Sequence, residues 1–142
     1  EADMIIGAVR IPGAAAPKLI SRPQLAELKP GAALVDVAID QGGCFETSHA
    51  TTHQDPVYEI DGIMHYCVAN MPGAVARTST LALGNATLPF LLALAGKGWK
   101  RACAEDRHLL AGLNTHAGKL TYAAVGAALG LPSIPAADAL NL

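Results

Sequence analysis

One apolar run, which breaks off into an acid, an amide and two glycines, constrains the fold of this chain more than any other stretch. Residues 34–39 are apolar except for Asp36, and Asp40, Gln41 and the pair Gly42-Gly43 follow them. Such a run is typical of a parallel strand covered on both faces, and paired glycines permit a sharp turn. Asp40 is therefore predicted at a strand end, where open α/β sheets bind ligands. Alternatively, Asp40 only caps the following turn, and these ten residues do not decide between the two.

A β-loop-α-β unit precedes and includes this strand. Residues 4–9 form a first predicted strand, and residues 21–28 form a helix that begins at Ser21 or Arg22 before a proline. Residues 57–60 and 63–68 are two further strands joined by a hairpin turn at Asp61-Gly62. The pattern predicts an α/β fold with parallel pairing, half of a doubly wound domain.

Three of the apolar runs end alike. They stop at Val9, Ile39 and Val68, and an irregular loop with small or polar residues follows each. In a parallel sheet such loops meet at one edge, so the sequence predicts a shared ligand-binding edge.

The second half of the chain is predicted to be helical, which divides the chain into domains 1–75 and 76–142. Residues 78–96 carry no charge and are apolar on nearly every face, so we expect a buried helix, kinked or broken at Pro89. A membrane span is the less favoured alternative because polar residues and a proline interrupt the segment. Residues 99–110 and 120–129 are further predicted helices, the second of which is closed by Gly130, and residues 134–142 are a tail.

Composition excludes several classes of protein. Hydrophobic residues make up 51% of the chain and charged residues 15%, so much of the surface is expected to meet other subunits or further sequence. A net charge of −2 leaves no electrostatic footprint for nucleic acid or a membrane surface. Three scattered cysteines argue against a disulfide framework or a structural zinc site and favour a reducing compartment.

The GxGxxG fingerprint of dinucleotide-binding sheets does not occur. If the sheet is Rossmann-like, its phosphate loop and ribose-binding acid are expected before Glu1, and this chain supplies the second half of the sheet, followed by helices that pack toward a missing N-terminal domain.

Eight motifs of the chain belong together: residues 3–13, 17–19, 29–31, 35–43, 51–53, 65–66, 68–75 and 77–80. In combination they resemble bacterial alanine dehydrogenases over essentially the whole chain. The NAD(H)-binding subunit of proton-translocating transhydrogenase shares this architecture and is the alternative, but residues 38–41, Ala-Ile-Asp-Gln, follow the dehydrogenase form.

The resemblance implies reversible oxidative deamination of L-alanine to pyruvate and ammonia with NAD, in a cytoplasmic homo-oligomer, commonly a hexamer. Asp40 matches the catalytic aspartate, which would stabilise positive charge that develops during the reaction. The resemblance also implies contacts with the cofactor, in which Asn70 would donate a hydrogen bond. The matching positions are Val9, Arg10, Val37, Ala38, Ile39, Asp40, His49, Val68, Ala69, Asn70 and Met71.

The chain departs from its relatives at three points. His49 stands where relatives often have an arginine, which weakens that contact because imidazole is mostly neutral at pH 7. Ala93 and Lys97 stand where some relatives have metal ligands, so no metal is expected. The family's catalytic histidine and substrate-binding lysine and arginine belong to the N-terminal domain, so this fragment alone is expected to be inactive.

The remaining reactive side chains are expected to be structural. His53, His65, His108 and His116 lack metal-ligand spacing. Cys44 lies near Asp40 but has no partner base in the motif, and it is predicted to be a packed thiol.

Overall fold

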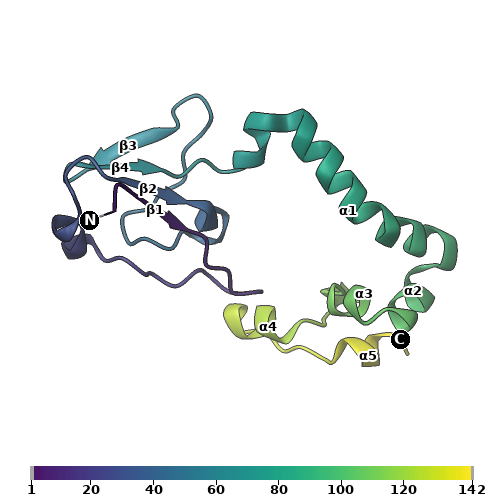
Figure 1. The fold of residues 1–142 in the computed structure, drawn as a ribbon. Coiled ribbons are helices and arrows are strands. Elements are labelled where there is room, and N and C mark those ends of the chain that lie inside the picture. The colour runs from purple at the N-terminus through teal and green to yellow at the C-terminus, as the bar shows by residue number, and fades with distance from the viewer. Residues whose placement is uncertain (1, 142) are drawn as a thin grey trace. The chain divides into compact units, whose positions relative to one another are not determined.

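The computed structural model describes residues 2–141, which divide into two compact units (Figure 1). The first unit ends at Val75 and contains a four-stranded sheet. The second begins at Ala76 and contains the α-helices and a two-stranded hairpin.

A mixed sheet forms the first unit. Its strands are β1 (Met4–Gly7), β2 (Ala33–Asp36), β3 (Val57–Ile60) and β4 (Ile63–Tyr66). The order is β1-β2-β4-β3, in which β1, β2 and β4 are parallel and β3 is antiparallel to β4. The predicted α/β class, with a Rossmann-like parallel sheet, is confirmed.

The three parallel strands end earlier than predicted, at Gly7, Asp36 and Tyr66. The prediction that the second strand reaches residue 39 is wrong, because Val37–Gln41 forms a 3-10 turn, η2. The Asp36 carboxylate starts this turn by accepting a hydrogen bond from the Ala38 backbone N–H at 3.1 Å. Apolar periodicity does not distinguish a short buried strand from a buried turn.

A small core lies against the sheet. Leu25, from the 3-10 helix η1 (Arg22–Glu27), packs with Leu34, Phe45 and Ile63, and each is at most 1% exposed. Gly7 permits the loop after β2 to approach β1, because a Cβ there would lie 2.3 Å from the Cys44 Sγ and 2.7 Å from the Phe45 ring. The end of β1 and the loop after β2 therefore pack directly on each other.

Two locally specified features form as predicted. Ser21 is the N-cap of η1, and its backbone N–H donates to the Gln24 Oε1 at 2.8 Å. Asp61 and Gly62 join β3 to β4 with φ values of 53° and 79°, which suit a tight hairpin turn.

The long helix α1 (Ala76–Lys97) opens the second unit, and none of its residues is buried by residues 2–141. The expectation of a buried helix is therefore not met within this chain. Pro89 lies inside α1 but does not break it. By length and composition Met71–Lys97 could cross a membrane, although core helices of soluble proteins pass the same test.

A second long helix was predicted over residues 99–110, but the structure has two short ones, α2 (Trp99–Glu105) and α3 (Arg107–Ala111). Asp106 separates them, because its carboxylate accepts hydrogen bonds from the backbone N–H groups of His108 and Leu109 and so starts a new helix.

The end of the chain is more structured than predicted. An unpredicted hairpin joins β5 (Thr115–His116) to β6 (Lys119–Leu120). The predicted helix over 120–129 is shorter, α4 (Ala123–Leu129), and ends at Gly130 in the left-handed conformation, as expected. The predicted tail contains the short helix α5 (Ala136–Ala139).

Candidate active site

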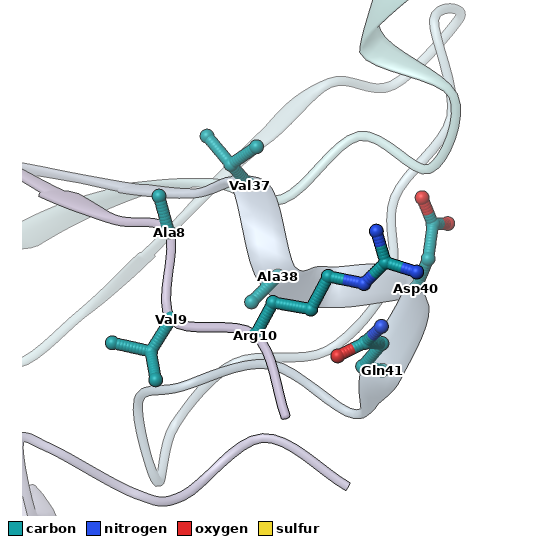
Figure 2. A pocket seen from close by; sticks show the side chains of 7 residues that line it. All are labelled: Ala8, Val9, Arg10, Val37, Ala38, Asp40 and Gln41. Carbon is teal, nitrogen blue, oxygen red and sulfur yellow. The ribbon is translucent and has the colours of Figure 1, made fainter. Parts of the chain in front are cut away.

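A cavity of about 250 Å³ opens where β1 and β2 end (Figure 2). Its lining comes from the residues that follow these two strands. They are Ala8, Val9 and Arg10 after β1, and Val37, Ala38, Asp40 and Gln41 after β2. Parallel pairing, with Gly7 opposite Asp36, places both strand ends at one edge, so the cavity lies where α/β sheets hold ligands.

Five of the predicted site residues line this cavity together: Val9, Arg10, Val37, Ala38 and Asp40. In Figure 2 the Arg10 side chain extends toward Asp40 and Gln41. Two lining residues, Ala8 and Gln41, were not predicted as site residues. Gln41 stands next to Asp40 in the sequence motif, which is the signal that identifies it.

The remaining predicted residues do not line the cavity. Ile39 lies within η2 and is buried. Val68, Ala69, Asn70 and Met71 follow β4, which neighbours β2 on its other side. Asn70 has a φ of 60°, and its backbone carbonyl accepts a hydrogen bond from the His53 Nε2 at 2.9 Å.

His49 also lies apart from the cavity lining. Its ring stacks on Tyr58 with centroids 3.7 Å apart, and Tyr58 stacks in turn on His65 at 4.9 Å. The Tyr58 hydroxyl accepts a hydrogen bond from the His49 backbone N–H and donates to the Thr47 carbonyl. Burial, with a hydrogen bond to Cys67, raises the pKa of Tyr58, so its hydroxyl stays protonated.

Asp40 is exposed, and its carboxylate makes no hydrogen bond or ion pair with residues 2–141. The turn that contains it is capped by Asp36 instead, which is completely buried. The capping role considered for Asp40 thus belongs to Asp36. Asp40 leaves a free negative charge beside the cavity.

The Asp36 carboxylate is saturated with donors. It accepts hydrogen bonds from the backbone N–H groups of Ala38, Cys44 and Phe45, from the Ser48 hydroxyl at 2.6 Å, and from the Cys44 thiol at 3.4 Å. Burial and the neighbouring Asp36 raise the pKa of Cys44. Cys44 therefore remains a thiol that donates to Asp36, in keeping with a packed rather than a nucleophilic cysteine.

His65 and His116 have structural contacts. His65 is buried and bonded through its two ring nitrogens to Thr47 and to the Ile63 carbonyl, and the His116 ring packs on Trp99. Among residues 2–141 no three His, Cys, Asp or Glu side chains are grouped so as to hold a metal ion.

Comparisons with known proteins agree with one another. Residues 1–123 match the family described as alanine dehydrogenase/PNT, C-terminal domain. Over 141 residues the chain is 67% identical to an alanine dehydrogenase of Halomonas elongata, covering 99% of this chain and 38% of that protein. It thus spans well under half of that relative's length.

Two solved structures share the fold. An L-alanine dehydrogenase superimposes with a TM-score of 0.74 at 48% identity, over 92% of this chain and 36% of that one. A transhydrogenase from Sinorhizobium meliloti superimposes with a TM-score of 0.61 at 27% identity, over 84% of this chain and 32% of that one.

Proposed function

The chain belongs to the alanine dehydrogenase/PNT C-terminal domain family, and on that premise we propose that it is the carboxyl-terminal part of an NAD-dependent alanine dehydrogenase. The observation that carries the proposal is the free carboxylate of Asp40 beside a cavity at the ends of two parallel strands. The reaction is the reversible oxidation of L-alanine to pyruvate and ammonia. Because the chain covers 38% of its relative, the remaining substrate-binding groups belong to the rest of the full-length protein.

The cavity fits one end of a dinucleotide. Its volume of about 250 Å³ is below the roughly 300–1,000 Å³ of pockets that enclose whole ligands, so it suits a single ring rather than a complete cofactor. Val9, Val37 and Ala38 supply apolar walls for such a ring. The Gln41 Oε1 is buried and has no hydrogen-bond partner within residues 2–141, so it is an acceptor suited to a carboxamide N–H.

Bound NAD would supply the hydride acceptor, and this chain would supply the electrostatics around it. Asp40 is the one carboxylate that lines the cavity. Its negative charge stabilises the positive charge that develops on the substrate nitrogen as the C–H bond breaks. Asp40 makes no hydrogen bond or ion pair with residues 2–141, although the Arg10 side chain extends toward it, so its carboxylate oxygens are free to bind the substrate.

A transhydrogenase subunit is the alternative, and it is less well supported. The transhydrogenase structure is 27% identical to this chain, against 48% for the dehydrogenase structure. The sequence Ala38-Ile39-Asp40-Gln41 also follows the dehydrogenase form of the motif, in which the acid is the aspartate that lines the cavity.

The assembly and location follow from the same proposal. We place the full-length protein in the cytoplasm as a homo-oligomer. The apolar and unburied surface of α1 supports an interface with protein that lies outside residues 2–141, because large exposed apolar patches are rare on a monomer in water.

The proposal is tested on the full-length protein by measuring NADH formation with L-alanine as the only substrate. We expect saturable, L-alanine-dependent NADH formation, and pyruvate and ammonia should reverse it. D-alanine serves as the control substrate. If L-alanine gives no NADH while the protein passes a hydride between NADH and an oxidised NADP analogue, the transhydrogenase alternative replaces the proposal.

A further inference from the structure

We propose that Asp36 and Lys18 are positioning residues that clamp the turn which carries Asp40, one from inside the fold and one from its surface. The proposal rests on the proposed function, in which Asp40 acts on the substrate. Neither Asp36 nor Lys18 is among the residues that line the cavity, so both would act only through the backbone of residues 37–43.

Asp36 holds the turn from inside. Its buried carboxylate binds the backbone N–H of Ala38, at the start of η2, and the N–H groups of Cys44 and Phe45, directly after the two glycines. One side chain thus joins the beginning and the end of the Asp40 turn. Hydrogen bonds to a charged group are stronger than those between neutral groups, and the buried carboxylate would be costly to leave unpaired.

The paired glycines make this closure possible. Gly42 and Gly43 have φ values of 87° and 72°, a region that other residues avoid. A Cβ on Gly43 would lie 2.8 Å from the Asp36 Oδ2 and 2.7 Å from the Ser48 Cβ, whereas a Cβ on Gly42 would meet nothing within 4 Å. Gly43 is therefore the point at which the turn passes over the Asp36 carboxylate.

Lys18 holds the same turn from the surface. Its Nζ donates to the Gly42 carbonyl at 2.5 Å and to the Gly43 carbonyl at 2.8 Å. Next to it, the Ala16 backbone N–H donates to the Gln41 carbonyl at 2.9 Å. The carbonyl groups of residues 41–43, at the C-terminal end of η2, thus accept hydrogen bonds from the segment after β1. A cation such as the Lys18 ammonium group is favoured at that end of a helical turn.

Asp40 depends on this clamp because its own side chain has no anchor in residues 2–141. The position of its carboxylate is set by the backbone of η2, and a displacement of about 1 Å at a reacting centre can cost about 100-fold in rate. By fixing the backbone of η2, the clamp therefore fixes the position of the Asp40 carboxylate.

The experiment uses the full-length protein with Lys18→Met, Lys18→Arg and Asp36→Asn. Lys29→Met is the matched control, because Lys29 is also an exposed lysine, but it pairs with Asp3 rather than with the turn. We expect Lys18→Met to lower kcat by about 10-fold with the KM for NAD changed by less than about 2-fold, the pattern of a lost transition-state interaction. Lys18→Arg should restore most of the rate, and Lys29→Met should leave it unchanged.

Two further readouts separate positioning from general stability. Combined with Asp40→Asn, Lys18→Met should cause no further loss of kcat, because a residue that acts through Asp40 has nothing left to position. In Lys18→Met, the rate of backbone hydrogen–deuterium exchange should rise in residues 37–45 relative to the wild-type protein and should not change in β3 and β4. Asp36→Asn should give the same pattern more strongly, and if that variant does not fold, the Lys18 variants still decide.

Additive losses in the double variant, or unchanged kcat in Lys18→Met, would overturn the proposal. Unchanged exchange in residues 37–45 would overturn it as well, and this readout needs no activity. A wild-type protein that forms no NADH from L-alanine would instead refute the proposed function, while the exchange comparison would still show whether the clamp exists.

Discussion

The turn after β2 and the helix α1 differ in whether residues 2–141 supply partners for their side chains. In the turn, the buried carboxylate of Asp36 finds five donors within the chain, and the neighbouring core residues are closed from solvent. In α1, 22 residues form a largely apolar helix of which none is buried by residues 2–141. The first region finds its partners within residues 2–141, whereas those residues leave the apolar surface of the second uncovered. Four experiments test that contrast, and they follow in order of decreasing expected effect.

The largest effect is expected at Asp40, the residue that the turn presents. In the full-length protein, Asp40→Asn keeps the size of the side chain and removes its charge. Turnover of L-alanine should fall by about 100- to 1,000-fold, as when one preorganised electrostatic contact is lost. The free energy of unfolding should change by less than about 1 kcal/mol, because the carboxylate has no structural partner in residues 2–141. Near-normal turnover with a large drop in melting temperature would assign Asp40 a structural role instead.

The next largest effect is expected at Gly43, where a substitution tests how closely the turn packs on Asp36. Gly43→Ala should lower the free energy of unfolding of the full-length protein by about 3 kcal/mol, because it adds close contacts with Asp36 and Ser48 to an unfavourable φ. Gly42→Ala is the matched control, since it has a similar φ but open space around it, and it should cost about 1 kcal/mol. Denaturant unfolding measures both. Equal losses in the two variants would show that the turn relaxes freely.

A smaller effect is expected in α1, whose apolar surface is not covered by residues 2–141. Leu92 in α1 is 63% exposed within this chain. If α1 is covered in the assembled protein, Leu92→Ser should destabilise it by about 2 kcal/mol and shift its mass toward the monomer in light scattering. Leu19→Ser, at a leucine of the first unit that is 51% exposed, is the control and should cost less than about 0.5 kcal/mol. An unchanged mass and stability in Leu92→Ser would mean that this side of α1 faces water.

The smallest effect concerns an exposed pair of ion contacts near the end of α1. Hydrogen bonds from Lys97 and Arg101 hold the pKa of Glu105 at about 2, below the ordinary value of 4.5. Because the folded pKa is the lower one, the stabilisation is present above pH 4.5 and is lost as the pH falls toward 2. Glu105→Gln should flatten the pH dependence of the melting temperature across that window, and added salt should reduce the difference between the two proteins. Parallel pH curves in low salt would contradict this.

Features set by local chemistry were predicted from the sequence. The Asp61-Gly62 turn and the end of α4 at Gly130 form as expected, and of the two helix starts considered, Ser21 and Arg22, the structure has Ser21 as the N-cap. Each depends on the backbone preference of one or two residues and on partners within a few positions, so sequence spacing is sufficient evidence. Five of the predicted site residues also line one cavity, because parallel strands bring successive strand ends to one edge.

Features that depend on partners distant in the sequence were not predicted. The run 34–39 has the composition of one strand, but the chain turns after Asp36 because the donors for that carboxylate come from Cys44, Phe45 and Ser48. In the same way, the apolar pattern of α1 predicts burial but cannot say which surface provides it. Local backbone preference and hydrophobic period were sufficient to predict the class of sheet, the Asp61-Gly62 hairpin turn and an acid at the sheet edge. That Asp36 is hydrogen-bonded while Asp40 has no hydrogen bond within residues 2–141 is a property of the folded chain, because the pairing of a carboxylate depends on which donors the fold brings to it.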